Sequence, residues 1–232
     1  MSAVFDSRAR WRRFVLPPLL VLGLVPILAG VSSAQSPAAD LKTFITSWYV
    51  HGMPYSDANA FGSAALPELI AMLHDPSMEA HWVKVVYTIG CIGDPAGVQP
   101  LMDFLKSQRG EISADAFRAA LGVLPAIGQI AYGGDAAALR IISDFVDPGA
   151  CSTYGVSLSY GRYHDAALSE VMGRMTIAAL GFSGRPAALD RLNQMFADHS
   201  LRPDWVDNVA EAININTRVV SLGPARAYTG GQ

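Results

Sequence analysis

The residues best suited to chemistry in this sequence lie in one tyrosine-rich stretch, residues 149–164. It carries Tyr154, Tyr160, Arg162, Tyr163 and His164. Tyrosine combines a large flat ring with a hydroxyl group and has few rotatable bonds to immobilise, so this composition is common on recognition surfaces. We therefore expect these five residues to form a binding site. The alternative is that the rings fold back onto neighbouring helices and fill space there.

Two cysteines, Cys91 and Cys151, are the only ones in the chain. They lack a Cys-x-x-Cys pattern, which argues against a redox enzyme. In an oxidising compartment an even pair can form a disulfide, and closing a loop of this size stabilises a protein by about 4 to 5 kcal/mol on the chain-entropy model. The pair is therefore a candidate disulfide. The alternative is two unpaired thiols, with Cys91 buried as a small apolar residue of its helix.

Motifs for catalysis or metal binding are missing from the sequence. It has no Gly-x-Ser-x-Gly and no His-Glu-x-x-His, and the glycine-rich run 90–97 lacks the Lys and Ser/Thr of a phosphate-binding loop. His74, Asp75 and His81 are near in sequence, but the seven residues that separate the two histidines span a turn, so they do not match two ligands on one helix face. We expect a protein that is not an enzyme, with no catalytic residue, no cofactor and no metal.

Aromatic residues also occur near both ends of the chain. Trp48, Tyr49 and His51 form one group, and Trp205 lies near the other end. If the chain folds into a stack of helices, the first and last helix each have an open side. We therefore expect these side chains to seal the two ends of the core. Contact with a partner is the alternative.

The elements that position these residues follow from a helix–turn–helix unit at residues 81–105. Apolar residues recur there at intervals of three and four, which places them on one helix face on each side of the turn. In the turn, Gly93 can end the first helix in a left-handed conformation, Asp94 can cap the next, and Pro95 suits its first turn.

Weaker copies of this unit recur downstream. Gly90, Gly128 and Gly181 occupy the same place in three such turns, at separations of 38 and 53 residues, from 128 − 90 and 181 − 128. The first separation is close to the period of helix-pair repeats of roughly 40 residues. The second is longer by 53 − 38 = 15 residues, and we interpret residues 149–164 as a loop inserted into the array.

The Ile-Gly-x-Ile-Gly-Asp-Pro turn between a Val-rich and a Leu-rich helix resembles HEAT repeats, in particular the short HEAT-like repeats of phycobilisome lyases and of many bacterial proteins. The resemblance covers about residues 64–199. It implies an all-α fold, an α-solenoid of about four antiparallel helix pairs with a concave face that binds a protein or an extended peptide. The lyases of this type hold a bilin, so the resemblance also admits a lyase-like or small-molecule-binding protein.

Periodicity and cap residues predict where the helices lie. We expect helices over 41–51, 58–73, 82–92, 98–105, 113–131, 136–145, 165–179, 187–197 and 204–220. Pro125 is expected to kink or break its helix, and Asp165 to cap the helix that follows it. The tail, residues 223–232, is expected to be flexible.

The N-terminus has the order of features of a secretory signal peptide. Four arginines precede an apolar run at 14–28, and small residues end at Ala34. We expect residues 1–34 to be cleaved and residues 35–222 to form the HEAT-like domain, which would then be periplasmic or secreted, without membrane insertion. An uncleaved N-terminal membrane anchor is the alternative.

Charge narrows the range of partners. Residues 35–232 carry 13 basic and 19 acidic side chains, a net charge of 13 − 19 = −6. Such a chain does not suit nucleic acid or an anionic membrane. We therefore expect an exported non-enzymatic scaffold that binds another protein or a peptide through its concave face and its tyrosine-rich insertion. The alternatives are a lyase-like or small-molecule-binding protein and a purely structural envelope component.

Overall fold

A computed structural model describes residues 37–50, 52–198 and 201–228. The chain divides into two units, Met1–Ala34 and Gln35–Gln232, and all described residues belong to the second. The expected signal peptide therefore lies outside the described residues, as do His51 and residues 229–232.

The described part of the chain is all-α, as the sequence predicts, with only two three-residue strands. The α-helices are α1 (Pro37–Thr46), α2 (Tyr55–Ala60), α3 (Leu66–Leu73), α4 (Trp82–Ile92), α5 (Val98–Ser107), α6 (Ala114–Tyr132), α7 (Ala136–Asp144), α8 (Ala150–Thr153), α9 (Asp165–Phe182), α10 (Pro186–Ala197), α11 (Val206–Leu222) and α12 (Pro224–Tyr228); the strands are β1 (Arg109–Glu111) and β2 (Ser157–Ser159). None of the described helices is long and apolar enough to serve as a membrane span.

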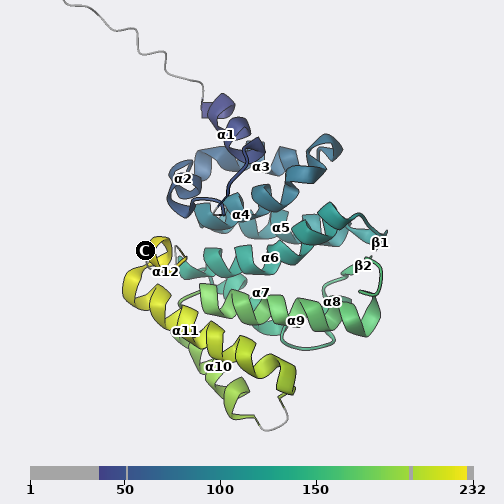
Figure 1. Cartoon of the computed structure of the whole chain (residues 1–232), viewed down its shortest axis with the longest axis vertical. Helices are drawn as coiled ribbons and strands as arrows, with labels where there is room; N and C mark the ends of the chain where they lie inside the picture. Colours follow the sequence, from purple (N-terminus) through teal and green to yellow (C-terminus); the bar gives the residue numbers. More distant parts are fainter. Residues whose placement is uncertain (1–36, 51, 199–200, 229–232) are drawn as a thin grey trace, which may run out of the picture. The chain divides into compact units, whose positions relative to one another are not determined.

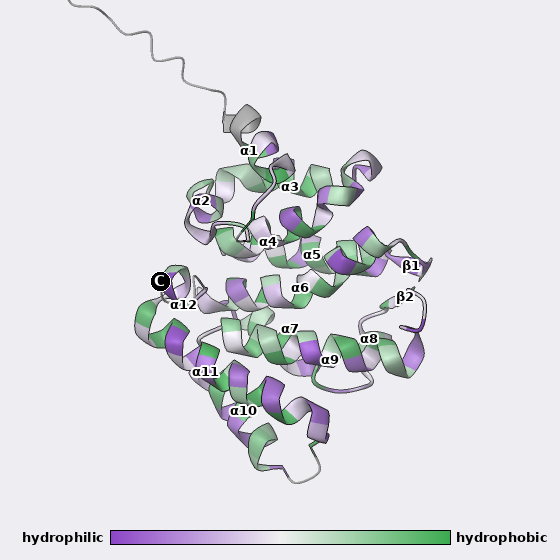
Figure 2. Cartoon of the chain, viewed as in Figure 1, coloured by the Kyte–Doolittle hydropathy of each residue, from purple (hydrophilic) through white to green (hydrophobic). Residues whose placement is uncertain are grey.

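Four helices pack side by side in chain order: α4, α6, α9 and α11. The others pack on this row, with α3 on α4, α5 and α7 on α6, and α10 on α9 and α11. Figure 1 shows the row descending through the molecule, with the two strands at one end of its helices and α12 at the other. Polar and apolar residues alternate around the helices in Figure 2, as expected for helices with one face in a core.

The three repeat glycines allow the row to pack closely. A Cβ at Gly90 would lie 2.8 Å from the Cα of Ala126, and a Cβ at Gly128 would lie 2.7 Å from the Cα of Ala179. A Cβ at Gly181 would lie 3.0 Å from the carbonyl oxygen of Ala212. Each glycine therefore marks the point where its helix touches the next one in the row. The equivalence predicted from sequence is also an equivalence of packing.

The turn between α4 and α5 forms as predicted. Gly93 has a left-handed backbone with φ 73°, which costs glycine little because it has no Cβ. The Asp94 side chain accepts a hydrogen bond of 2.8 Å from the amide of Ala96, and Pro95 begins the next turn. Local sequence is sufficient to determine this connection.

Two local predictions need correction, and a third, the kink or break at Pro125, is narrowed. The helix expected over 58–73 is divided into α2 and α3, because Gly62 has φ 63° and ends helical continuity. By contrast α6 continues through the buried Pro125 without a break. Asp165 does not cap α9: it is the first residue of the helix, with φ 47°, and His164 occupies the cap position without a side-chain bond.

The aromatic residues near the two ends of the chain differ in burial. Trp205 is buried and packs where Gly173 leaves room, as expected for the end of a core. Tyr49 packs against Phe44, with ring centroids 5.4 Å apart and an interplanar angle of 54°. Trp48, however, is 88% exposed, so the prediction that it seals the core is wrong. It follows the end of α1 at Thr46 and has left the buried helix face.

Candidate binding cavity

The insertion at residues 149–164 is more ordered than the loop predicted from sequence. It forms α8 and then β2, which pairs in parallel with β1; Leu158 lies opposite Gly110. Val156 and Leu158 are buried, whereas Ser157 between them is exposed. This alternation is the period of a strand, and it was the available signal in the sequence.

The three tyrosines of the insertion pack inward. Tyr160 and Tyr163 stack on Phe117 of α6, with centroids at 5.0 and 5.2 Å and interplanar angles of 27° and 25°. Tyr154 stacks on Phe145 at 4.8 Å. All three are half-buried. One face of each ring therefore packs against another ring of the protein. This is the alternative in which the tyrosines fill space on neighbouring helices.

The other two predicted residues of the insertion are exposed. The Arg162 guanidinium lies over the Tyr163 ring, 5.2 Å from its centroid. His164 Nδ1 lies 3.1 Å from a carboxylate oxygen of Asp165. Of the five predicted residues, the three tyrosines therefore pack against Phe117 and Phe145, whereas Arg162 and His164 stay exposed.

A first cavity, the insertion cavity, lies beside this segment and has a volume of ≈ 570 Å³. Its lining includes Arg109, His164 and the serines 152, 157, 159 and 169. Cys151 also lines it, but burial raises the pKa of this thiol, so the thiolate nucleophile is disfavoured. The serines provide hydroxyl groups for hydrogen bonding, and Val156, Leu158 and Leu168 contribute an apolar part of the lining.

The candidate disulfide does not form. Cys91 and Cys151 are separate buried thiols in α4 and α8. Cys151 lines the insertion cavity, whereas Cys91 lines a different cavity. Burial raises the pKa of Cys91 to about 12. The tertiary structure places the two thiols at different cavities, and their spacing in the sequence does not reveal this.

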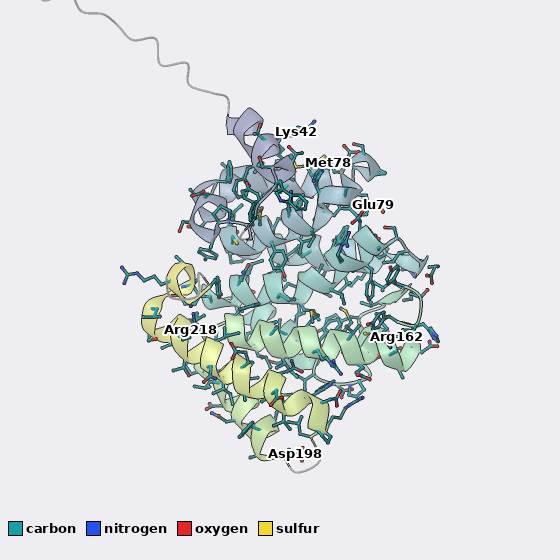
Figure 3. The ribbon with its side chains drawn as sticks, viewed as in Figure 1. Lys42, Met78, Glu79, Arg162, Asp198 and Arg218 are labelled. Carbon is teal, nitrogen blue, oxygen red and sulfur yellow. The ribbon has the colours of Figure 1, made fainter. Side chains whose placement is uncertain are left out.

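A second cavity, which we call the aromatic cavity, lies at the opposite end of the helices and has a volume of ≈ 490 Å³. Four aromatic side chains line it: Tyr55, Tyr87, Phe182 and Tyr228. They come from α2, α4, α9 and α12. Figure 3 shows Arg218, another lining residue, on α11 beside α12, and Arg162 of the insertion at the far end of the molecule.

Helix α12 closes one side of the aromatic cavity. The Tyr228 ring meets Tyr55 at 5.3 Å and Phe182 at 5.2 Å, and its hydroxyl donates a hydrogen bond of 2.9 Å to the Phe182 carbonyl. Arg218 donates to the carbonyl of Ala227 at 2.7 Å. Residues 224–228 are therefore an anchored helix, where the sequence predicts a flexible tail; Ala227 is buried because α11 and α2 both pack against α12.

The interior of the aromatic cavity is uncharged at neutral pH. Burial raises the pKa of Tyr55 to about 12 and raises that of Tyr228 as well. The Cys91 thiol is equally protonated, and its sulfur lies 3.8 Å from the amide oxygen of Gln129. These groups can donate hydrogen bonds without contributing charge.

Two side chains of opposite charge lie on the α11 wall of the aromatic cavity. They are Glu211 and Arg218, with Ile215 between them. Glu211 is exposed and forms no salt bridge with any residue that the structure describes. The cavity thus combines a neutral aromatic interior with one carboxylate and one guanidinium.

Sequence reasoning did not select these residues, although a signal exists. Cys91, Gln129 and Phe182 each directly follow a repeat glycine, and all three line the aromatic cavity. Gln129 and Phe182 also lie three residues after the alanines, Ala126 and Ala179, that contact the preceding helix of the row. The residue three positions after the corresponding alanine of α11, Ala212, is Ile215, which lines the cavity too. The same position relative to the packing contact therefore lines the cavity in α4, α6, α9 and α11.

Comparison of the chain with known protein families, with characterised proteins and with solved structures found no match. The resemblance to HEAT repeats therefore rests on the turn motif alone and stays a prediction.

Proposed function

We propose that this chain is a non-enzymatic binding protein that holds a small molecule in the aromatic cavity. The observation that carries the proposal is the convergence of four repeat-equivalent residues, Cys91, Gln129, Phe182 and Ile215, from four consecutive helices of the row. The volume of ≈ 490 Å³ lies within the range of small-molecule sites. An apolar aromatic wall with a few polar groups is the usual lining of such sites.

The architecture that we propose for it is a short solenoid of helix pairs similar to HEAT repeats. Its support is the regular contact in the row, where Gly90, Gly128 and Gly181 each lie against an alanine of the next helix. In a solenoid, equivalent residues of successive repeats share one face and build a continuous binding surface. The four cavity residues follow this rule.

The chemistry of the lining supports binding without catalysis. Cys91 is a protonated thiol next to an amide oxygen, and an amide is not a base that could activate it. The phenols of Tyr55 and Tyr228 are also held in their neutral forms. General acid–base catalysis uses a group that gains or loses a proton near neutral pH, and these three buried groups do not titrate in that range.

Export is part of the proposal. It rests on the basic leader, the apolar run and the small residues that end at Ala34. A periplasmic or secreted location follows if the segment is cleaved, and a membrane-anchored location if it is retained.

Binding of a protein or peptide at the insertion is the second proposal. It is favoured by the exposure of Arg162 and His164 beside the three tyrosines. The half-buried rings present less free surface than that function would use. The aromatic cavity is the better supported site for this reason.

A cavity-filling variant tests the proposed function. Ile215→Trp adds a large side chain to the α11 wall, whereas Val220→Trp changes the same helix at a position that is 62% exposed. The probe is N-phenyl-1-naphthylamine, a neutral dye whose fluorescence rises when it leaves water. We expect saturable binding at one site in the wild type and in Val220→Trp, and at least about tenfold weaker binding in Ile215→Trp. Equal binding by both variants, or none by the wild type, would contradict the proposal.

A further inference from the structure

We infer that the aromatic cavity takes a zwitterionic small molecule that carries an alkylated ammonium group and a carboxylate or phosphate group. This inference rests on the proposed function, because it names the class of ligand for the same site. It follows from the orientation of the rings and from the two charges on α11.

The rings of the cavity are arranged as walls. Tyr228 meets Tyr55 with an interplanar angle of 69° and Phe182 with an angle of 78°. Adjacent rings are therefore close to perpendicular, and Tyr55, Phe182 and Tyr228 line the cavity together with Tyr87. Aromatic walls of this kind attract an ammonium group whose methyl groups remove it from water, through the negative faces of the rings.

The charges on α11 differ in sign and share one helix face. Glu211, Ile215 and Arg218 stand at positions i, i+4 and i+7, which align along a helix. Seven residues correspond to about 10 Å along the helix axis. Flexible side chains can shorten this distance toward a ligand between them. The α11 wall is therefore negative toward its start and positive toward its end.

This pair of charges distinguishes a zwitterion from a simple ion. A lone cation would be attracted by Glu211 and repelled by Arg218, and a lone anion would experience the reverse. A zwitterion can place its ammonium group near the carboxylate and its acidic group near the guanidinium. Arg218 uses one donor on the Ala227 carbonyl and keeps other N–H groups for an anion.

The neutral interior strengthens this selectivity. Tyr55, Tyr228 and Cys91 are protonated, so no charge in the aromatic part competes with the ammonium group. Phenol hydroxyls and the Gln129 amide supply dipoles, which orient a ligand without repelling either of its ends.

Isothermal titration calorimetry with three matched compounds tests the inference. They are γ-butyrobetaine, which has both charges; choline, which has only the ammonium; and 3,3-dimethyl-1-butanol, the neutral isostere of choline. We expect the zwitterion to bind about tenfold more tightly than choline, and choline about tenfold more tightly than the isostere.

Charge-removing variants assign the two ends of the ligand. Glu211→Gln should weaken the zwitterion and choline alike, whereas Arg218→Gln should abolish the advantage of the zwitterion and leave choline unchanged or stronger. Asp207→Asn is the control, since it makes the same charge change as Glu211→Gln on the same helix without lining the cavity. It should leave all three affinities unchanged.

The outcomes separate this inference from the function beneath it. If the neutral isostere binds as tightly as the other two, or if none of the three binds while the dye still distinguishes Ile215→Trp from Val220→Trp, the ligand class is wrong and the cavity remains a binding site. If the dye also fails to distinguish those two variants, the proposed function fails as well.

Discussion

The two ends of this protein are both rich in aromatic residues, but they use them differently. At the insertion, Tyr160 and Tyr163 lie nearly parallel to Phe117, at 27° and 25°. At the aromatic cavity, Tyr228 lies nearly perpendicular to Tyr55 and Phe182, at 69° and 78°. Both arrangements are packing contacts, but Tyr55, Phe182 and Tyr228 also line the aromatic cavity. Aromatic composition alone therefore does not identify a binding site.

The origin of the rings explains the difference. In the insertion, neighbouring residues of one segment fold back onto α6 and α7, so each ring finds an apolar surface that already exists. In the cavity, the rings come from helices that are far apart in the sequence, and they meet only because the packing of the helices between them brings those segments together. Four measurements test this difference between the two ends.

Removal of the insertion tyrosines should have the largest effect on stability. In the variant with Tyr154, Tyr160 and Tyr163 all changed to Ala, we expect a loss of about 4 kcal/mol in the free energy of unfolding, because three half-buried rings lose their stacking partners. Urea denaturation followed by circular dichroism would measure it. A stable variant that fails to bind a protein partner would instead favour the insertion as the binding site.

A change in the spacing between α6 and α9 should have the second-largest effect on stability. It should also affect binding, because this spacing sets the dimensions of the aromatic cavity. Gly128→Ala would place a Cβ 2.7 Å from the Cα of Ala179 and closer still to its carbonyl oxygen, and we expect it to cost about 3 kcal/mol and to weaken dye binding. Gly122→Ala is the matched control in the same helix, since its nearest neighbour would be 3.4 Å away at a Val86 methyl group. The control should unfold within about 1 kcal/mol of the wild type. Similar losses in the two variants would show that close packing is not the cause.

Closure by α12 should make a smaller contribution to stability. Tyr228→Phe removes only the hydrogen bond to the Phe182 carbonyl, which is worth about 1 kcal/mol. We expect faster amide hydrogen exchange in α12 and weaker dye binding, with the insertion unaffected. Tyr163→Phe serves as a comparison, because it retains its stacked ring. Unchanged exchange in Tyr228→Phe would mean that the ring contacts alone hold α12.

The smallest effect at neutral pH concerns Cys91. Its pKa is raised from 9.0 to about 12, so the unfolded chain releases the thiol proton first as the pH rises. The contribution of this thiol to stability is complete below pH 9 and is lost as the pH approaches 12. Wild type should therefore lose more stability than Cys91→Ala between pH 8 and about 10. Iodoacetamide should label Cys91 slowly in the folded protein, and rapid labelling would contradict its burial.

Much of the local structure could be predicted from the sequence. The connection at Gly93, Asp94 and Pro95 forms as its residue types require, and the spacing of the repeat glycines identifies three equivalent helix contacts. These features depend on interactions within a few residues or on a repeated small residue. The predictions failed where the backbone took a different path from the one a local rule assumes, as at Asp165, which begins α9 with φ 47° instead of capping it.

The sequence by itself determined that this chain is helical, where most helices begin and end, and which glycines allow close packing. Only the tertiary structure decided which aromatic residues fill space and which surround it. The physical reason is distance along the chain: helix caps and periodicity act over a few residues, whereas the aromatic cavity exists because Tyr55 and Tyr228 meet from opposite ends of the described sequence. Contacts of that range depend on the packing of all the helices between them.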